Sequence, residues 1–136
     1  MRFKRVWSLV LCLWIMICSS LIGTMVATTE PSQIKSTLIG STVADVDVGA
    51  LKTTVIGSVQ GVSTVTRVKI KLELQKKSGE SYSTIKTWEE MFYSNEATKT
   101  ESKLTSPLNT YRLKATFTAY TNTSSETRVV YAYDNK

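Results

Sequence analysis

The side chains that most often carry catalysis or bind metal ions are scarce in this chain. It contains no histidine, and both of its cysteines, Cys12 and Cys18, lie in an apolar segment near the N-terminus. The rest of the chain therefore cannot form Ser-His-Asp or Cys-His nucleophilic sites or the usual zinc sites. Carboxylate catalysis needs paired acids, but the adjacent Glu89 and Glu90 would point apart on a strand. We therefore predict no catalytic or cofactor-binding residues and no enzymatic activity.

Asp45 and Asp47 come nearest to a metal site. They are two residues apart, so on a strand they would share one face. They could bind Ca²⁺ if carbonyl oxygens from a loop joined them. A solvated strand edge explains two such aspartates equally well, and we predict no metal site.

Basic residues form the clearest candidate for a binding site. Polar and apolar residues alternate along 65–77 and again along 110–121. Successive strand residues point to opposite faces, so each segment should be a strand with one buried face and one solvated face. If the two strands are neighbours, their outward cations form one face that could bind an anionic polymer, such as a cell-wall glycan or teichoic acid. The alternative is that these cations only discourage aggregation. The candidate residues are Arg67, Lys69, Lys71, Arg112 and Lys114.

Aromatic residues offer three further features. Trp88 could stack on a ligand, but a β-sandwich commonly buries one large aromatic side chain, so we expect it in the core. The consecutive residues Met91-Phe92-Tyr93 predict a loop that either folds over the end of the domain or binds another surface protein. The outward tyrosines near the C-terminus should form cross-strand pairs.

The first 27 residues predict export. Three basic residues within the first five precede an apolar run that extends to about Ile22, and small residues follow. This is the pattern of a secretory signal peptide, cleaved after Ala27 or after Ser20. The alternative is an uncleaved anchor, because 6–27 is long enough to span a bilayer. In both cases we expect the remainder to be secreted or held at the extracellular cell surface, with no other membrane contact.

The charge balance argues against a nucleic-acid partner. The chain has 17 basic and 11 acidic residues, and three of the basic residues belong to the export segment. Cleavage would leave 14 basic residues against 11 acidic ones. Such a mild excess suits solubility and weak attraction to anionic surfaces, and it is far from a nucleic-acid-binding composition.

Short strands separated by turns account for the remaining sequence. Residues 28–41 read as a linker or a loosely held first strand, and 42–136 form one domain rich in alternating segments. Gly57 suggests a bulge, and the mixed faces of 82–88 suggest another bulge or a strand paired on both sides. The segment 89–95 has no readable pattern. Seven short strands in one domain predict an all-β antiparallel sandwich. The expected strands are 43–48, 51–60, 65–77, 82–88, 97–104, 110–121 and 127–133.

The sequence PLNTYRLKA at 107–115 resembles the approach to strand F of immunoglobulin-like and fibronectin type III-like domains. Tyr111 matches the tyrosine at the start of that strand, the tyrosine corner, and the resemblance implies that it bonds back to the preceding loop. Leu113 stands where a cysteine is usual in antibody domains. The resemblance implies an immunoglobulin-like fold and no particular activity.

A second resemblance concerns origin. The sequence LQKKSG at 74–79, the later Trp88 and YRLKA at 111–115 are similar to small exported proteins of Gram-positive bacteria. This resemblance implies export behind a signal peptide and leaves the activity open. We therefore predict a non-catalytic secreted or cell-surface binding module. The alternative is a structural spacer domain that an uncleaved N-terminal anchor tethers to the membrane.

Overall fold

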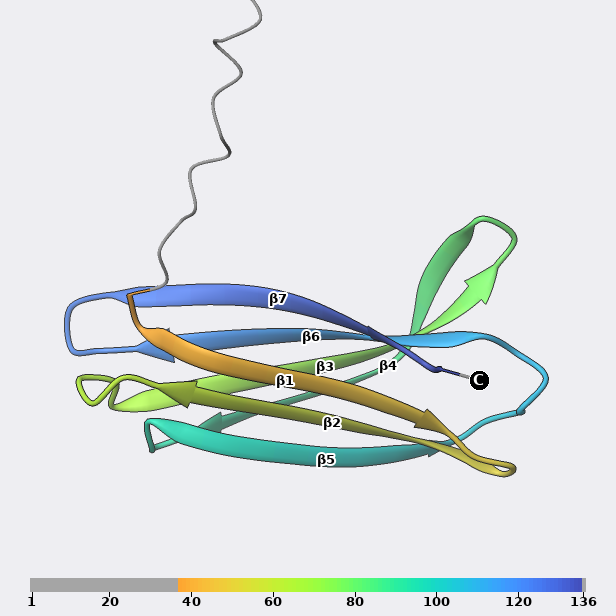
Figure 1. Cartoon of the computed structure of the whole chain (residues 1–136), viewed down its shortest axis with the longest axis horizontal. Helices are drawn as coiled ribbons and strands as arrows, with labels where there is room; N and C mark the ends of the chain where they lie inside the picture. The colour runs from red at the N-terminus through yellow and green to blue at the C-terminus, as the bar shows by residue number, and fades with distance from the viewer. Residues whose placement is uncertain (1–36, 136) are drawn as a thin grey trace, which may run out of the picture. The chain divides into compact units, whose positions relative to one another are not determined.

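The computed structural model describes residues 37–135, and residues Ser36–Lys136 form one compact unit. The predicted signal peptide or anchor at 1–27 and most of the predicted linker lie outside the described residues. Within 37–135, no helix is long and apolar enough to cross a membrane. Seven strands follow one another (Figure 1): β1 (Ile39–Val48), β2 (Lys52–Gly61), β3 (Arg67–Ser78), β4 (Ser81–Phe92), β5 (Glu96–Leu104), β6 (Tyr111–Tyr120) and β7 (Ser125–Tyr133).

The strands form two antiparallel sheets that pack face to face. One sheet has the order β1-β2-β5 and the other the order β4-β3-β6-β7. The predicted all-β sandwich of seven antiparallel strands is therefore confirmed. The bounds of β2, β3, β5, β6 and β7 differ from the predicted ones by at most two residues. A local alternation of polar and apolar side chains marks β3 and β6 most clearly, whereas β5 is almost entirely polar.

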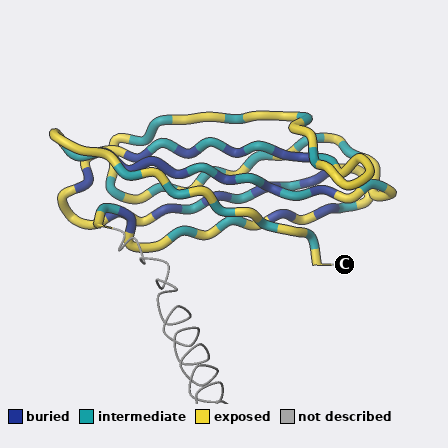
Figure 2. The backbone as a smooth tube through the Cα atoms, turned by 90° about the horizontal axis from the view of Figure 1, so that it is seen from above, coloured by how far each residue is buried: buried dark blue, intermediate teal, exposed yellow. Residues whose placement is uncertain are grey.

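The core lies between β3 and β6 of the larger sheet and the strands of the smaller one. Alternate residues of β3 and β6 have no exposed surface, whereas most of their neighbours in sequence are half-buried or exposed; the exceptions are Gln75 and Thr118, which are buried polar residues. Figure 2 shows this alternation of buried and less buried positions along the strands. Burial of these aliphatic side chains is the main favourable term in the stability of the domain. The fully buried residues of the two strands are Val68, Ile70, Leu72, Leu74, Leu113, Ala115, Phe117 and Ala119.

Gly57 marks a close approach of the two sheets, and the predicted bulge at this position is wrong. Gly57 pairs in unbroken register with Ala44 of β1 and Lys99 of β5. A Cβ atom at Gly57 would lie 2.6 Å from Leu72 Cδ2 and 3.3 Å from Phe117 Cε1 of the opposite sheet. Glycine is needed here because the facing side chains already fill the space.

The predicted irregularity in the fourth strand is confirmed as a bulge. Leu74 of β3 pairs with Lys86, but the next residue, Gln75, pairs with Thr84. Ile85 is therefore the extra residue of β4, and such a bulge bends the strand and increases its twist. Figure 1 shows the end of the β3–β4 hairpin turning away from the line of the other strands.

The β3–β4 hairpin closes in a two-residue turn, which is shorter than the predicted loop at 76–81. Ser78 pairs with Ser81, so only Gly79 and Glu80 connect the strands. Gly79 has a φ of 62°, and no other described residue has a positive φ. Glycine at the first turn position with positive φ is the pattern of a type II′ turn, which matches the twist of the flanking strands.

The prediction of a loop at Met91-Phe92-Tyr93 is wrong for two of its three residues. Strand β4 continues to Phe92, with Met91 paired to Lys69 and Phe92 paired to Val68. Phe92 packs against the core, and only Tyr93 lies in the following turn, where it is 83% exposed. Three consecutive large apolar residues hide the strand pattern because they occupy the outer face, the inner face and the turn.

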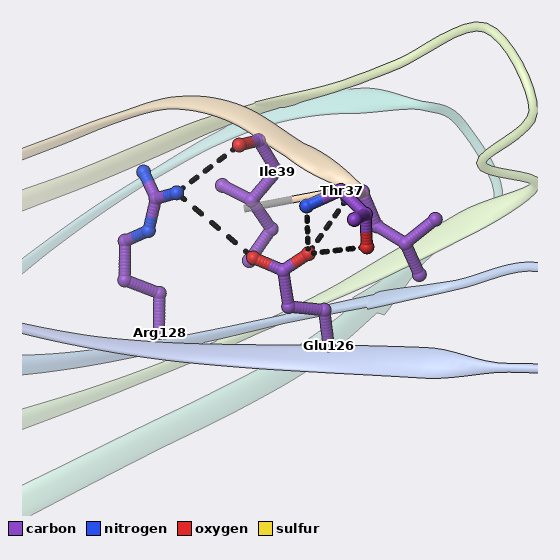
Figure 3. A network of polar contacts seen from close by, with 5 residues as sticks. Thr37, Ile39, Glu126 and Arg128 are labelled. Carbon is purple, nitrogen blue, oxygen red and sulfur yellow. Dashed lines mark hydrogen bonds and ion pairs between the residues drawn. The ribbon is translucent and has the colours of Figure 1, made fainter. Parts of the chain in front are cut away.

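Strand β1 begins at Ile39, inside the predicted linker 28–41. Side chains of β7 hold this start in place (Figure 3). Glu126 Oε2 accepts hydrogen bonds from the backbone N–H groups of Thr37 and Leu38, at 2.9 and 2.6 Å. Arg128 Nη2 donates to the carbonyl oxygen of Ile39 at 3.1 Å. The sequence pattern missed this start because the contacts that order it come from residues almost ninety positions away.

Candidate binding face

The structure brings all five predicted basic residues to one surface, which we call the basic face. It is the outer face of the four-stranded sheet and carries Arg67, Lys69 and Lys71 of β3 with Arg112 and Lys114 of β6. Strands β3 and β6 pair along their whole length. Each of the five residues alternates with core residues that have little or no exposed surface, so all five point away from the core.

Two acidic side chains lie among these cations. Glu73 is directly opposite Lys114 across β3 and β6, and its Oε2 lies 3.6 Å from Lys114 Nζ. Glu89 of β4 lies with its Oε1 3.9 Å from Lys69 Nζ. Partly exposed pairs of this kind add little to stability, but they lower the positive potential of the basic face. Sequence reasoning missed Glu89 because β4 was not recognised at this point.

The basic residues differ in how far they are engaged. Arg67 stacks on Tyr120, with its guanidinium carbon 4.9 Å from the ring centroid. Lys69 and Lys114 have the acidic neighbours just described. Lys71 takes part in none of the ion pairs or ring contacts formed among residues 37–135. Glu89 of β4 is directly opposite Lys71, but the carboxylate of Glu89 pairs with Lys69 instead.

Arg112 is held by what we call the arginine cradle, formed by Gln75, Tyr82, Tyr131 and Tyr133. The guanidinium carbon lies 4.0 Å from the Tyr82 ring centroid and 4.7 Å from that of Tyr131. Arg112 Nε donates to Gln75 Oε1 at 2.7 Å, and Nη1 donates to the Tyr133 hydroxyl oxygen at 3.4 Å. Cation–π contacts and hydrogen bonds thus fix the guanidinium in one position.

The arginine cradle depends on the bent β3–β4 hairpin. In the sheet order β4-β3-β6-β7, two strands separate Tyr82 of β4 from Tyr133 of β7. Their rings nevertheless meet edge to face, with centroids 6.4 Å apart and an interplanar angle of 75°. The bulge at Ile85 provides the bend that such a contact requires. Sequence reasoning assigned the C-terminal tyrosines to cross-strand pairs and had no signal for Tyr82.

Tyr111 is buried, with 3% of its surface exposed. Its hydroxyl oxygen accepts a hydrogen bond of 3.4 Å from Asn109 Nδ2, in the loop that precedes β6. The contact to the preceding loop resembles the one that a tyrosine corner makes. It differs in the donor, because the hydroxyl of a tyrosine corner bonds to the backbone. Tyr111 faces the core and does not belong to the basic face.

The side of the sandwich between β4 and β5 is closed by polar side chains. Lys99 Nζ lies 2.7 Å from Glu101 Oε1 and 2.8 Å from Glu90 Oε2. The hydrogen bond that Lys99 donates to Glu101, followed by the one that it donates to Glu90, raises the pKa of Lys99 above its ordinary value of 10.5. Trp88, on β4, is half-buried and packs against the core. These residues hold the two sheets together and do not form a reactive centre.

Asp45 and Asp47 lie on the outer face of β1, beside a hollow that Tyr133 and Asp134 also line. Residues 37–135 contain no group of three or more histidine, cysteine, aspartate or glutamate side chains placed to hold a metal ion. We therefore propose no metal site in this hollow.

No known protein-family model matches this chain, and no curated protein matches it either. We therefore base the proposal below on the basic face and the arginine cradle.

Proposed function

We propose that this protein is a non-catalytic secreted or cell-surface binding module whose basic face binds an anionic cell-wall polymer. The observation that carries this proposal is the gathering of five basic side chains on one face of one sheet. The whole chain has only a modest excess of basic residues, so their concentration on one face creates a local positive potential. Such a potential attracts anions at a rate and strength that depend on ionic strength.

The spacing of the cations suits a repeating anion. Alternate residues on a strand, such as Lys69 and Lys71, are about 6.5–7 Å apart, and neighbouring strands are about 4.8 Å apart. The basic face therefore presents its cations in one staggered line, with three along one half of β3 and two along the opposite half of β6. A flexible polymer with one charge per repeat could contact several of them at once, so weak individual contacts would add up to useful affinity.

We further propose that the sandwich is an immunoglobulin/fibronectin III-like domain. The strand order β1-β2-β5 and β4-β3-β6-β7 supports this. It differs from the constant-type immunoglobulin arrangement in the fourth strand, which joins the sheet of the third, sixth and seventh strands. The contact between Tyr111 and the preceding loop also supports it. Export is supported by the basic and apolar start of the chain.

A tethered spacer domain is the second candidate, and one observation favours it. Glu126 and Arg128 bind the backbone at 37–39, where the chain enters the domain. An anchored protein would bear load at this junction. Sequencing the N-terminus of the exported protein decides between the two. A start near Thr28 excludes the tether, and a start at Met1 supports it.

The binding proposal is tested with the purified exported protein and isolated cell walls, at low and high salt. In the variant Lys69→Gln/Lys71→Gln/Lys114→Gln, three cations of the basic face are lost. In the control Lys52→Gln/Gln60→Glu/Thr100→Glu, the net charge falls equally, but on the outer face of the three-stranded sheet. Three exposed charge contacts of about 0.5–1 kcal/mol each predict a loss of about 10- to 100-fold for the first variant only.

Two results would reject the proposal. The wild-type protein could fail to bind cell walls at low salt, which would exclude the basic face as a binding site. The two variants could instead lose binding equally, which would show that net charge alone is responsible. The proposal is supported if the wild type and the control bind at low salt but not at high salt, and if the lysine-to-glutamine variant binds much more weakly.

A further inference from the structure

We infer that Arg112 in the arginine cradle is the anchoring residue of the basic face, and that its ligand is an oxoanion attached to a sugar ring. The inference rests on the proposed function and narrows the polymer to an acidic glycan. It follows from three properties of the arginine cradle: a fixed guanidinium, N–H groups left free to donate, and exposed tyrosine rings beside them.

The guanidinium is positioned before any ligand arrives. Tyr82 and Tyr131 both contact it, and Gln75 accepts the hydrogen bond from Nε. A free arginine side chain would lose much rotamer freedom on binding, whereas this one has already lost it on folding. The planar fork of arginine also matches a carboxylate or phosphate group in a way that a lysine ammonium cannot.

Arg112 has donors to spare. A guanidinium carries five N–H groups, of which one on Nε binds Gln75 and one on Nη1 binds Tyr133. Arg112 is half-buried, and within 37–135 no buried side-chain nitrogen or oxygen lacks a partner. Nη2 has no acceptor among these residues, so it must be reachable from solvent. Two N–H groups on Nη2 and one on Nη1 can therefore bind two oxygens of one oxoanion.

The surface beside Arg112 suits a sugar ring. Tyr131 is 44% exposed and Tyr133 is 52% exposed on the edge strand β7. Tyrosine combines an apolar ring with a hydroxyl that can bond to water or to a ligand. A sugar can place its C–H groups on such a ring and its hydroxyls toward solvent. An inorganic polyanion has no apolar face and gains nothing from these rings.

The cations of the basic face continue from the arginine cradle. Lys114 follows Arg112 by two residues on β6, and Lys71 lies on the neighbouring strand beside Thr116. An acidic glycan anchored at Arg112 could therefore extend across the sheet and meet further cations. Polyphosphate could also bind the fork of Arg112, but it has no sugar ring to place on the tyrosines.

Isothermal titration calorimetry with the purified exported protein tests this with three probes. Polygalacturonate carries a carboxylate on each sugar, dextran has sugars without charge, and polyphosphate has charge without sugars. We expect the wild type to bind polygalacturonate and not dextran. Arg112→Lys keeps the charge but loses the fork, which suits carboxylate and phosphate alike, so it should weaken polygalacturonate binding about tenfold and weaken polyphosphate binding as well.

Tyr131→Leu is the second variant, which keeps Arg112 with its hydrogen bonds to Gln75 and Tyr133 but removes one of the two rings on the guanidinium. It should weaken binding of polygalacturonate by about three- to tenfold and binding of polyphosphate by less than about twofold, because only the sugar loses a ring surface. Thermal unfolding of both variants shows whether they are folded, and the lysine-to-glutamine triple variant shows the loss expected of the basic face.

The outcomes separate the two proposals. If both polyanions bind and folded Arg112→Lys and Tyr131→Leu treat them like the wild type, the sugar-specific anchor is wrong and the basic face remains. If neither polyanion binds the wild type, the proposed function is wrong as well. Loss of polygalacturonate binding in both variants, together with little change in polyphosphate binding in Tyr131→Leu, supports the inference.

Discussion

The two outer faces of the sandwich arise from the same strand alternation, yet they differ in chemistry. The outer face of the four-stranded sheet carries the five cations of the basic face and the arginine cradle. The outer face of the three-stranded sheet is covered with hydroxyl pairs, such as Thr54 with Ser102 at 3.1 Å and Ser58 with Thr98 at 2.9 Å. Asp45 and Asp47 add negative charge to that second face.

The difference shows what each level of structure contributes. Alternation along a strand decides which residues face solvent, and this holds equally for both sheets. Strand pairing then decides which outward residues become neighbours. The pairing of β3 with β6 collects cations, whereas the pairing of β2 with β5 collects threonine and serine hydroxyls. A binding site on this fold is therefore a property of one sheet and not of the domain as a whole.

The largest expected effect comes from moving the cations to the other face. Adding Thr54→Lys, Thr98→Lys and Thr100→Lys to the lysine-to-glutamine triple variant restores the net charge. We expect polygalacturonate affinity to stay at least about tenfold below wild type, because the new cations have no arginine cradle beside them. Calorimetric titration measures this. Full recovery would mean that the two faces differ in charge alone.

The next effect concerns the side of the sandwich between β4 and β5, where Lys99 joins the two sheets. Lys99→Met leaves Glu90 and Glu101 without their cation, so the free energy of unfolding should fall by about 1–2 kcal/mol, a modest value because both carboxylates are partly exposed. Urea unfolding measures this. Lys103→Met, which removes a lysine without an ion pair on the same strand, should cost less than about 0.5 kcal/mol. Equal losses in the two variants would show that the ion pairs contribute nothing.

The stabilisation from Lys99 should also depend on pH. Its pKa is raised in the folded protein above the ordinary 10.5, so the folded state binds the proton more tightly than the unfolded state. The stabilisation is then complete below that ordinary value and is lost as the pH rises through the higher folded pKa. We therefore expect the difference between wild type and Lys99→Met to shrink at alkaline pH. A constant difference across this range would contradict the assignment.

A smaller effect is expected when an acidic side chain is removed from the basic face. Glu73 lies 3.6 Å from Lys114 Nζ on the basic face, so Glu73→Gln should strengthen polyanion binding about two- to fivefold. Glu96→Gln makes the same change in net charge on the other outer face and should alter binding by much less. An equal gain in both variants would indicate a long-range effect of net charge.

The smallest effect is expected on the face without a proposed role. Thr54→Val removes the exposed hydroxyl contact with Ser102 and places a β-branched apolar side chain on the strand. The free energy of unfolding should change by less than about 0.5 kcal/mol, and polyanion affinity should stay the same. A large loss of binding here would overturn the assignment of the site to the basic face.

Sequence alone determined the class of fold and the orientation of the central strands. The alternation along β3 and β6 predicted both their buried and their solvated residues, and with them all five cations of the basic face. These predictions succeed because the direction of a side chain on a strand depends on local backbone geometry. The resemblance to immunoglobulin-like domains also implied that these two strands are neighbours, and β3 does pair with β6.

Only the tertiary structure decided the features that depend on distant parts of the chain. Glu126 holds the start of β1 through hydrogen bonds to its backbone. Position 57 must be glycine because Leu72 of the opposite sheet fills the space beside it. Glu89 lies on the basic face because β4 pairs with β3. The arginine cradle likewise needs a bulge to carry Tyr82 across two strands. No local pattern encodes these contacts, because they arise from sheet pairing and packing between residues far apart in the chain.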